Sequence, residues 1–154
     1  MKILIATDGT KYAEAAVEML GKFDLGPNDS IKIISVVDLA MPLAVDVYGG
    51  YLPDTTQLEK AARENAEKAV KATIDRLGIL FGEQLPVSSD ILFGSPDSRI
   101  VETAESMPAD LIVIGSHGYN RWERLLLGSV SHSVVHHAPC SVLVVRIPAS
   151  DQAG

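Results

Sequence analysis

The glycine-rich segment that begins at Gly115 holds the residues best suited to chemistry in this chain. Gly115-Ser-His-Gly118 follows an apolar run, and after a spacer of nine residues Gly128-Ser129 opens a predicted helix. Glycine lets the main chain approach a ligand closely and adopt a positive φ. The unpaired N–H groups at a helix start can then face an anion. This spacing therefore predicts a cradle for phosphate groups.

Other signatures of nucleotide or catalytic chemistry do not occur in the sequence. It contains no G-x-x-x-x-G-K-[ST] loop, and the turn Asp8-Gly9-Thr10 is not G-x-G-x-x-G. There is no G-x-S-x-G either, and the neighbours Ser116 and His117 do not by themselves form a relay. His132 and His136 have helical spacing but no third ligand of known position. Polar surface histidines are the favoured interpretation, so we expect no metal site built from protein side chains.

Composition limits the classes of function. The 154 residues suit one domain, and the apolar fraction of 47% suffices for a core. A net charge of −7 argues against nucleic-acid partners and anionic membranes. A lone Cys140 excludes an intrachain disulfide, and no apolar run is long enough for a signal peptide or a membrane span. We expect a cytoplasmic protein without membrane insertion.

Strand-like and helix-like patterns alternate along the chain. The predicted strands cover residues 3–7, 31–37, 87–93, 111–114 and 142–145. Four helices are predicted. The first is capped by Thr10, and the second opens with the capping box at Thr56 and stops at Gly78. The third starts at Ser95-Pro96, and the fourth covers residues 129–137. Residues 39–54 form an irregular loop in this interpretation. The pattern predicts an α/β domain over residues 1–147, with a flexible tail at 148–154.

Alternating strands and helices favour a doubly wound, Rossmann-like fold. Five parallel strands in the order 3-2-1-4-5, with helices on both faces, are the simplest arrangement. Ligands bind such sheets outside the carboxyl ends of the strands, where the strand order reverses. Asp8 follows the first strand, Val36 lies near the end of the second, and Gly115 follows the fourth. These residues can converge on one crevice.

The pattern G-x2-G-x9-G-S, from Gly115 to Ser129, resembles the nucleotide-binding motif of the universal stress protein family. The resemblance covers nearly the whole chain. Lys2-Ile-Leu-Ile-Ala-Thr-Asp8 resembles the opening strand of the family, and Ser141-Val-Leu-Val-Val resembles its closing strand. Gly94-Ser-Pro fits as well. The intact motif resembles the branch of the family that binds ATP, so ATP, with Mg²⁺ or Mn²⁺, is the expected cofactor.

The resemblance also implies a role for each matching residue. Ala6 and Asp8 would contact the adenosine, with Asp8 accepting hydrogen bonds from ribose hydroxyls, and Val36 would offer its backbone to the adenine edge. Thr7, between Ala6 and Asp8, belongs to the same expected nucleotide site. The rest of the expected nucleotide site comprises Ile114, Gly115, Ser116, His117, Gly118, Arg121, Gly128, Ser129, Val130 and Ser131. Structural alternatives stay open. Asp8 can simply cap the following helix, Ser129 is a natural N-cap, and Arg121 can be solvated.

Three functions are compatible with these residues. The first is a nucleotide-responsive stress or regulatory protein that forms a homodimer or larger oligomer through the strand at 141–146. The second is a slow Mg-dependent ATPase or phosphotransferase, which the lack of an obvious general base and of a loop lysine disfavours. The third is an interaction module that has lost its nucleotide, which the intact motif disfavours. The expected partners are therefore an adenine nucleotide and further copies of the chain.

Overall fold

One parallel sheet organises the molecule. The computed structural model describes residues 1–38, 55–117 and 127–147. Its strands are β1 (Lys2–Ala6), β2 (Ser30–Val37), β3 (Val87–Phe93), β4 (Leu111–Gly115) and β5 (Ser141–Val145). They pair in the order β3-β2-β1-β4-β5 and are all parallel. This order confirms the predicted 3-2-1-4-5 arrangement and places β5 at an edge of the sheet.

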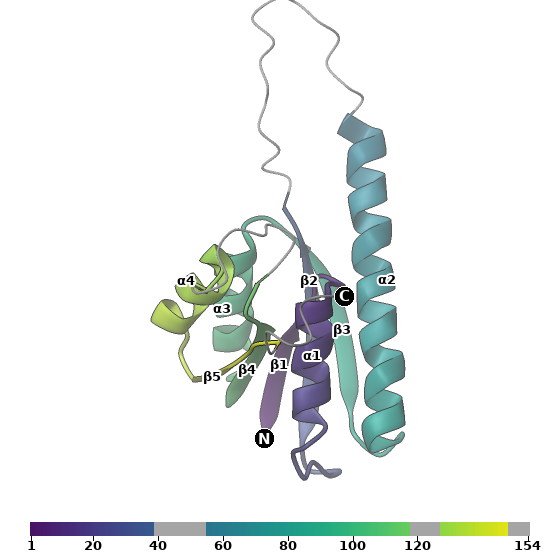
Figure 1. Ribbon diagram of the computed structural model, residues 1–154, viewed down its shortest axis with the longest axis vertical. Coiled ribbons are helices and arrows are strands. Elements are labelled where there is room, and N and C mark those ends of the chain that lie inside the picture. The colour runs from purple at the N-terminus through teal and green to yellow at the C-terminus, as the bar shows by residue number, and fades with distance from the viewer. Residues whose placement is uncertain (39–54, 118–126, 148–154) are drawn as a thin grey trace, which may run out of the picture.

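The described helices cover both faces of the sheet. They are α1 (Lys11–Leu20), α2 (Thr55–Phe81), α3 (Pro96–Ser106) and α4 (Ser129–His137). Helices α1 and α2 pack on one face, and α3 and α4 pack on the other (Figure 1). No helix in the described ranges is long and apolar enough to cross a membrane.

The central strand β1 shows why the sheet is covered twice. Ile3 and Ile5 belong to the core under α1 and α2, and Leu4 belongs to the core under α3 and α4. All three side chains are 0% exposed. Alternate residues of a strand point to opposite faces, so an uninterrupted apolar run requires cover on both sides. Burial of each such side chain contributes about 1.5–3 kcal/mol.

Helix α2 differs from the prediction at both ends. It begins at Thr55 and continues past Gly78 to Phe81, so Gly78 does not stop it. Glycine in a helix costs about 1 kcal/mol, which the burial of Leu77 beside it outweighs. The residue after the helix is Gly82, whose φ of +72° is the left-handed conformation common just past a helix C-terminus. The N–H of Gly82 donates to the carbonyl oxygen of Gly78 at 2.9 Å.

The inward face of α2 is buried over only part of its length. Its buried residues are Ala66, Ala69, Val70, Thr73 and Leu77, whereas Leu58, near the start of the helix, is 41% exposed. The first turns of α2 extend beyond the sheet (Figure 1). Periodicity alone could not show where the sheet ends beneath the helix.

Two predicted N-caps occupy the right positions but do not cap with their side chains. Thr10 precedes α1 and Ser95 precedes α3, and neither side chain bonds to the helix backbone. The Thr10 hydroxyl donates to Asp8 Oδ1 at 2.7 Å, and the Ser95 hydroxyl donates to Asp97 Oδ1 at 2.6 Å. Each hydroxyl thus donates to a carboxylate, a charge-assisted bond that is stronger than the neutral bond of a side-chain cap.

Candidate functional site

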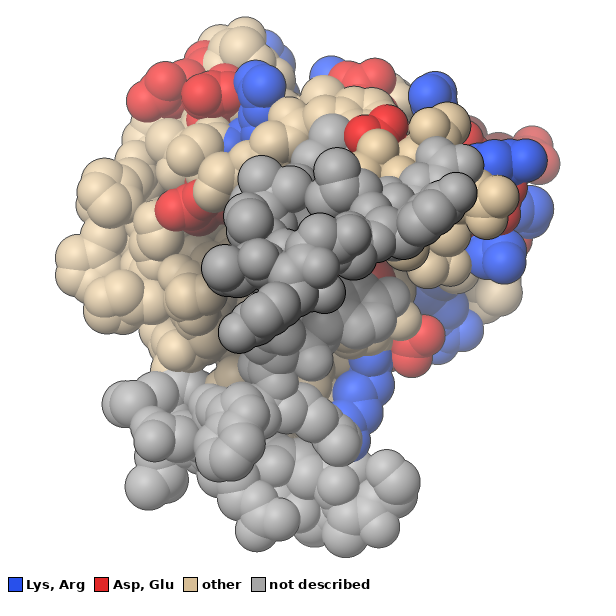
Figure 2. Space-filling model, turned by 90° about the horizontal axis from the view of Figure 1, so that it is seen from above, with Lys and Arg blue, Asp and Glu red and all other residues tan. Residues whose placement is uncertain are grey.

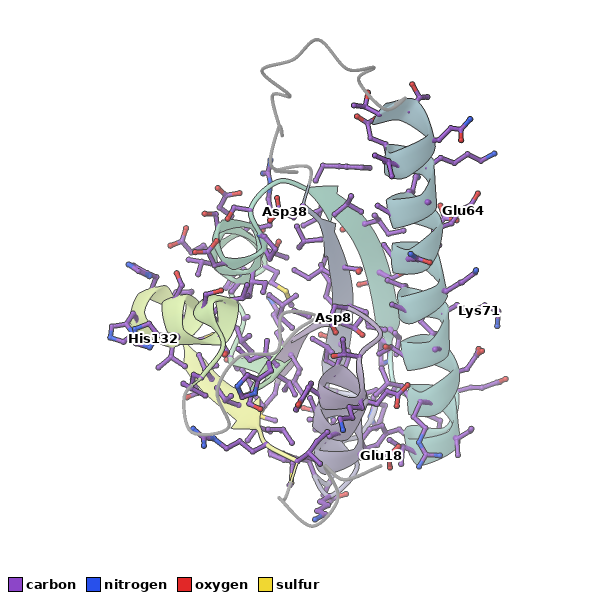
Figure 3. The ribbon with its side chains drawn as sticks, turned by 45° about the horizontal axis from the view of Figure 1, so that its top comes forward. Asp8, Glu18, Asp38, Glu64, Lys71 and His132 are labelled. Carbon is purple, nitrogen blue, oxygen red and sulfur yellow. The ribbon has the colours of Figure 1, made fainter. Side chains whose placement is uncertain are left out.

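The carboxyl end of β1 brings Ala6, Thr7 and Asp8 to one edge of the sheet. Ala6 is half-buried, and Thr7 is buried, with its N–H donating to the carbonyl oxygen of Ile34 at 2.9 Å. Asp8 lies above the start of α1 (Figure 3). Its Oδ1 accepts the N–H of Thr10 at 3.0 Å as well as the Thr10 hydroxyl. Within the described residues Oδ2 accepts no hydrogen bond, so it remains able to bind a ligand hydroxyl.

The backbone of Val36 faces the same edge. In a strand, successive residues direct their N–H and C=O groups to opposite sides. Ile34 bonds toward β1 through Thr7, and the carbonyl oxygen of Val37 accepts the N–H of Gly94 on the other side at 3.1 Å. The polar groups of Val36 therefore point toward the β1 side, beyond the last bond between these strands. That orientation suits the edge of a planar base.

Ser116 joins the end of β4 to the start of α4. Ser116 is 1% exposed, and its N–H donates to the carbonyl oxygen of Val145 at 2.8 Å. Its own carbonyl oxygen accepts the N–H of Gly128 at 2.9 Å and the hydroxyl of Ser131 at 2.9 Å. The two halves of the glycine motif are therefore held together by direct hydrogen bonds. Ile114 is buried just before this junction.

The N-terminus of α4 is built differently from the prediction. Gly128, and not Ser129, is the N-cap, so the predicted capping role of Ser129 is wrong. A Cβ on residue 128 would lie 3.2 Å from the carbonyl oxygen of Ser116, which explains a glycine at this position. The first helical hydrogen bond joins the N–H of His132 to the carbonyl oxygen of Gly128 at 2.9 Å.

The first turn of α4 leaves backbone donors without helical acceptors. These are the N–H groups of Ser129, Val130 and Ser131, as at any helix start. Gly128 and Ser131 belong to the expected nucleotide site, but the N–H of Gly128 and the hydroxyl of Ser131 have acceptors within the protein. The helix dipole favours negative charge at this end. The arrangement can bind an anion through main-chain groups.

Gly115 has a packing role that the sequence did not reveal. A Cβ on this residue would lie 2.7 Å from the backbone carbon and oxygen of Tyr12 in α1. The close approach of α1 and β4 thus requires glycine whether or not a ligand binds. The Tyr12 ring also lies 5.3 Å from the His117 ring, and His117 Nδ1 lies 3.0 Å from Ser116 Oγ. Gly118 and Arg121 lie outside the described residues, as do 39–54 and 148–154.

A groove of about 730 Å³ lies between α1 and α2. It meets the strand edge at Thr7, Asp8 and Gly9 and is lined further down by the small residues Ala69 and Ala72. The sequence did not predict this groove, because small residues on one face of a helix are typical of a buried core face. Viewed onto the edge, charges of both signs gather on the side of α2 (Figure 2). Helix α4 itself carries no Lys, Arg, Asp or Glu.

Comparison with known proteins establishes the family. The model of the universal stress protein family matches residues 1–146. The chain belongs to the universal stress protein family. A universal stress protein of Methanocaldococcus jannaschii is 34% identical, with 97% of this chain and 84% of that protein covered. A putative universal stress protein of Staphylococcus aureus is 35% identical, with 97% and 88% covered.

Solved structures of universal stress proteins share the fold. The protein UspA from Lactobacillus plantarum is 26% identical and superposes with a TM-score of 0.70, covering 95% of this chain and 97% of that one. An Arabidopsis thaliana family member with AMP bound is 15% identical, with a TM-score of 0.68 and coverage of 98% and 94%. A universal stress protein in complex with cAMP is 22% identical, with a TM-score of 0.64 and coverage of 95% and 96%. The last two likenesses establish the fold alone.

Proposed function

We propose that this universal stress protein binds an adenine nucleotide, ATP in particular, at the carboxyl edge of its sheet. The observation that carries the proposal is the start of α4. There the N–H groups of Ser129, Val130 and Ser131 have no helical acceptor. The bond from Gly128 to Ser116 holds this helix start beside the end of β4. A helix N-terminus in this position is a ready site for phosphate.

The adenosine would lie toward β1 and β2. Val36 directs its backbone N–H and C=O past the end of β1, and Asp8 keeps Oδ2 for a ribose hydroxyl. Ala6, half-buried between them, leaves room for a ring. AMP and cAMP, the ligands of two proteins with this fold, both consist of adenosine with one phosphate. The proposal that the ligand carries further phosphates, as ATP does, is supported by the glycine motif.

A divalent cation would arrive with the nucleotide. Among the described residues no group of three or more His, Cys, Asp or Glu side chains could hold a metal ion. Mg²⁺ commonly binds through substrate phosphates with few protein ligands. Mg²⁺ or Mn²⁺ on the phosphates would therefore offset their charge, while the chain contributes its α4 amides.

The proposed role is that of a cytoplasmic, nucleotide-responsive regulatory protein that forms homo-oligomers, with residues 1–147 as the nucleotide-binding domain. Among the described strands β5 lies at an edge of the sheet, and its outer edge would offer backbone groups to a second copy. Light scattering with and without ATP tests this part. A protein that stays monomeric across the accessible concentration range, in both conditions, would contradict the oligomeric role.

Nucleotide binding is tested first on the protein as purified. We expect a copurifying adenine nucleotide and a rise in melting temperature on adding ATP, because a ligand that binds only the folded state stabilises it. The Gly128→Ala variant should bind ATP at least about tenfold more weakly, since its Cβ would displace the Ser116 carbonyl. Gly26→Ala, with open space around its Cβ, is the matched control. Absence of both bound nucleotide and thermal shift, or equal ATP affinity in the two variants, would refute the proposal.

Asp8→Asn separates the ligand role of Asp8 from its turn role. Asparagine keeps an oxygen for the N–H and hydroxyl of Thr10, and both asparagine and aspartate form this kind of turn with the backbone two residues on. We therefore expect unchanged stability in urea and a several-fold loss of ATP affinity. If ATP affinity is also unchanged, Asp8 serves only the turn.

A further inference from the structure

We propose that His132 and His136 form a chelating site for a divalent transition-metal ion on the outer face of α4. Both residues are exposed, and they lie one helical turn apart. His132 projects from the side of α4 that faces away from the sheet (Figure 3). The ring centroids lie 4.4 Å apart, and the ring planes are inclined by 41°. This site is separate from the α4 amides assigned to the nucleotide.

The ring separation is close to that of a shared ion. With each Nε2 about 2.1 Å from a tetrahedral Zn²⁺, two imidazoles have ring centroids about 5 Å apart. The observed separation is 4.4 Å, so side-chain rotation needs to open the pair by less than about 1 Å. A helix presents residues i and i+4 as neighbours on one face, which keeps both rings on the same side.

A hydrogen bond sets the tautomer of His136. Its Nδ1 lies 3.0 Å from the backbone carbonyl oxygen of His132. A carbonyl oxygen can only accept, so Nδ1 carries the hydrogen, and in the neutral ring the lone pair is on Nε2. Histidines that ligate metals commonly donate their second N–H to a backbone carbonyl in this way, which orients the ring. The ring of His136 is thus prepared as a ligand through Nε2.

Imidazole nitrogens select the class of metal. They suit Zn²⁺, Cu²⁺ and Ni²⁺, whereas Mg²⁺ and Ca²⁺ prefer oxygen ligands. No group of three or more metal-binding side chains exists among the described residues, so water or an external ligand would complete the coordination. Cys140 does not compete, because burial raises the pKa of its thiol and keeps it protonated. The histidine pair would therefore bind a transition-metal ion and not the Mg²⁺ carried on a nucleotide.

His137 provides a matched control on the same helix. Its Nδ1 lies 2.8 Å from the carbonyl oxygen of Ser133, so its ring has the same kind of backbone anchor. The Ser133 hydroxyl beside it donates to Asp97 at 2.7 Å. No second histidine lies one turn before His137, because residue 133 is serine. Substitution of His137 removes an anchored imidazole without removing half of the pair.

The test is titration of the untagged 154-residue chain, without nucleotide, with Zn²⁺ by calorimetry. We expect one ion per chain, and loss of about tenfold or more in affinity in both His132→Gln and His136→Gln. His137→Gln and Cys140→Ser should retain the affinity of the parent protein. Long-range ¹H–¹⁵N spectra of the parent should show Zn²⁺ shifting the Nε2 resonances of His132 and His136 together.

Two results would overturn the proposal. One is unchanged Zn²⁺ affinity in the double variant His132→Gln/His136→Gln. The other is a Zn²⁺-induced shift of the His137 resonances without any change at His132 and His136. The three histidines are exposed, and Cys140→Ser exchanges a partly buried thiol for a hydroxyl of similar size, so circular dichroism should show the parent fold in every variant.

Discussion

The hydroxyl of Ser131 donates to the carbonyl oxygen of Ser116 at 2.9 Å, and so joins the first turn of α4 to the end of β4. Ser131 is 3% exposed and Ser116 is 1% exposed, so the bond is sheltered from water. The hydroxyl lies 3.0 Å from the carbonyl oxygen of Gly128 as well. The side chain of Ser131 thus positions the helix start, and only its backbone N–H remains for a ligand.

A pair of substitutions at Ser131 isolates this hydroxyl. Threonine and valine have nearly the same shape, so the strain of the extra methyl group cancels between Ser131→Thr and Ser131→Val. We expect the valine variant to unfold at lower urea, with a free energy of unfolding about 1–2 kcal/mol below that of the threonine variant. The valine variant should also bind ATP more weakly than the threonine variant. Equal stability of the pair would show that the bond contributes nothing.

Gly115→Ala should destabilise the fold. Its Cβ would lie 2.7 Å from backbone atoms of Tyr12, which cannot rotate away as a side chain can. Relief requires α1 and β4 to separate, at an expected cost of about 1–3 kcal/mol or more. Urea denaturation measures this loss, with Gly26→Ala as the control in open space. A variant as stable as the parent would mean that α1 shifts freely.

Glycines at the end of α2 should respond with opposite signs. Gly78 lies inside the helix with nothing within 4 Å of its Cβ position, so Gly78→Ala should stabilise the protein by about 0.5–1 kcal/mol. Gly82 has a φ of +72°, so Gly82→Ala should destabilise it. Thermal and urea unfolding of both variants provide the measurement. A loss of stability in Gly78→Ala would contradict the helical assignment there.

Asp97 should make stability depend on pH in the acid range. Hydrogen bonds from Ser95 and then Ser133 lower the pKa of Asp97 below its ordinary 3.8. The folded state thus favours the carboxylate. Its contribution is complete above the ordinary pKa and is lost as pH falls through that value toward the lowered one. In urea unfolding from about pH 6 to about pH 2.5, Asp97→Asn should flatten the acid-side decline. An identical decline in parent and variant would exclude this role.

Periodicity and connection rules predicted most of the fold. The apolar runs gave the five strands, and right-handed crossovers left one simple strand order, which the structure confirms. The end of α2 was wrong because the penalty of Gly78 is local, whereas the burial of Leu77 that offsets it depends on tertiary packing. Helix propensity read from the sequence includes the penalty of Gly78 but not the burial of Leu77.

The candidate site was predictable where it depends on strand order and not where it depends on contacts. Strand order brings Asp8, Val36 and Gly115 to one edge. The approach of Tyr12 to Gly115 depends on how closely α1 packs, which no spacing in the sequence records. The close contact of the N-cap position, Gly128, with the carbonyl oxygen of Ser116 is likewise a tertiary contact that no sequence spacing records. The nucleotide contacts themselves stay predictions.

The pairing of β1 with β4 has a consequence for folding. Ile3 pairs with Leu111, and the N–H of Asp110 donates to the carbonyl oxygen of Lys2 at 2.8 Å. The first strand therefore pairs with a strand from much later in the chain. During synthesis, β1 can pair with β2 early, but its other edge stays open until β4 has left the ribosome. Such long-range closure slows folding. The proposed nucleotide site spans this junction, so it can form only after the two halves of the sheet have paired.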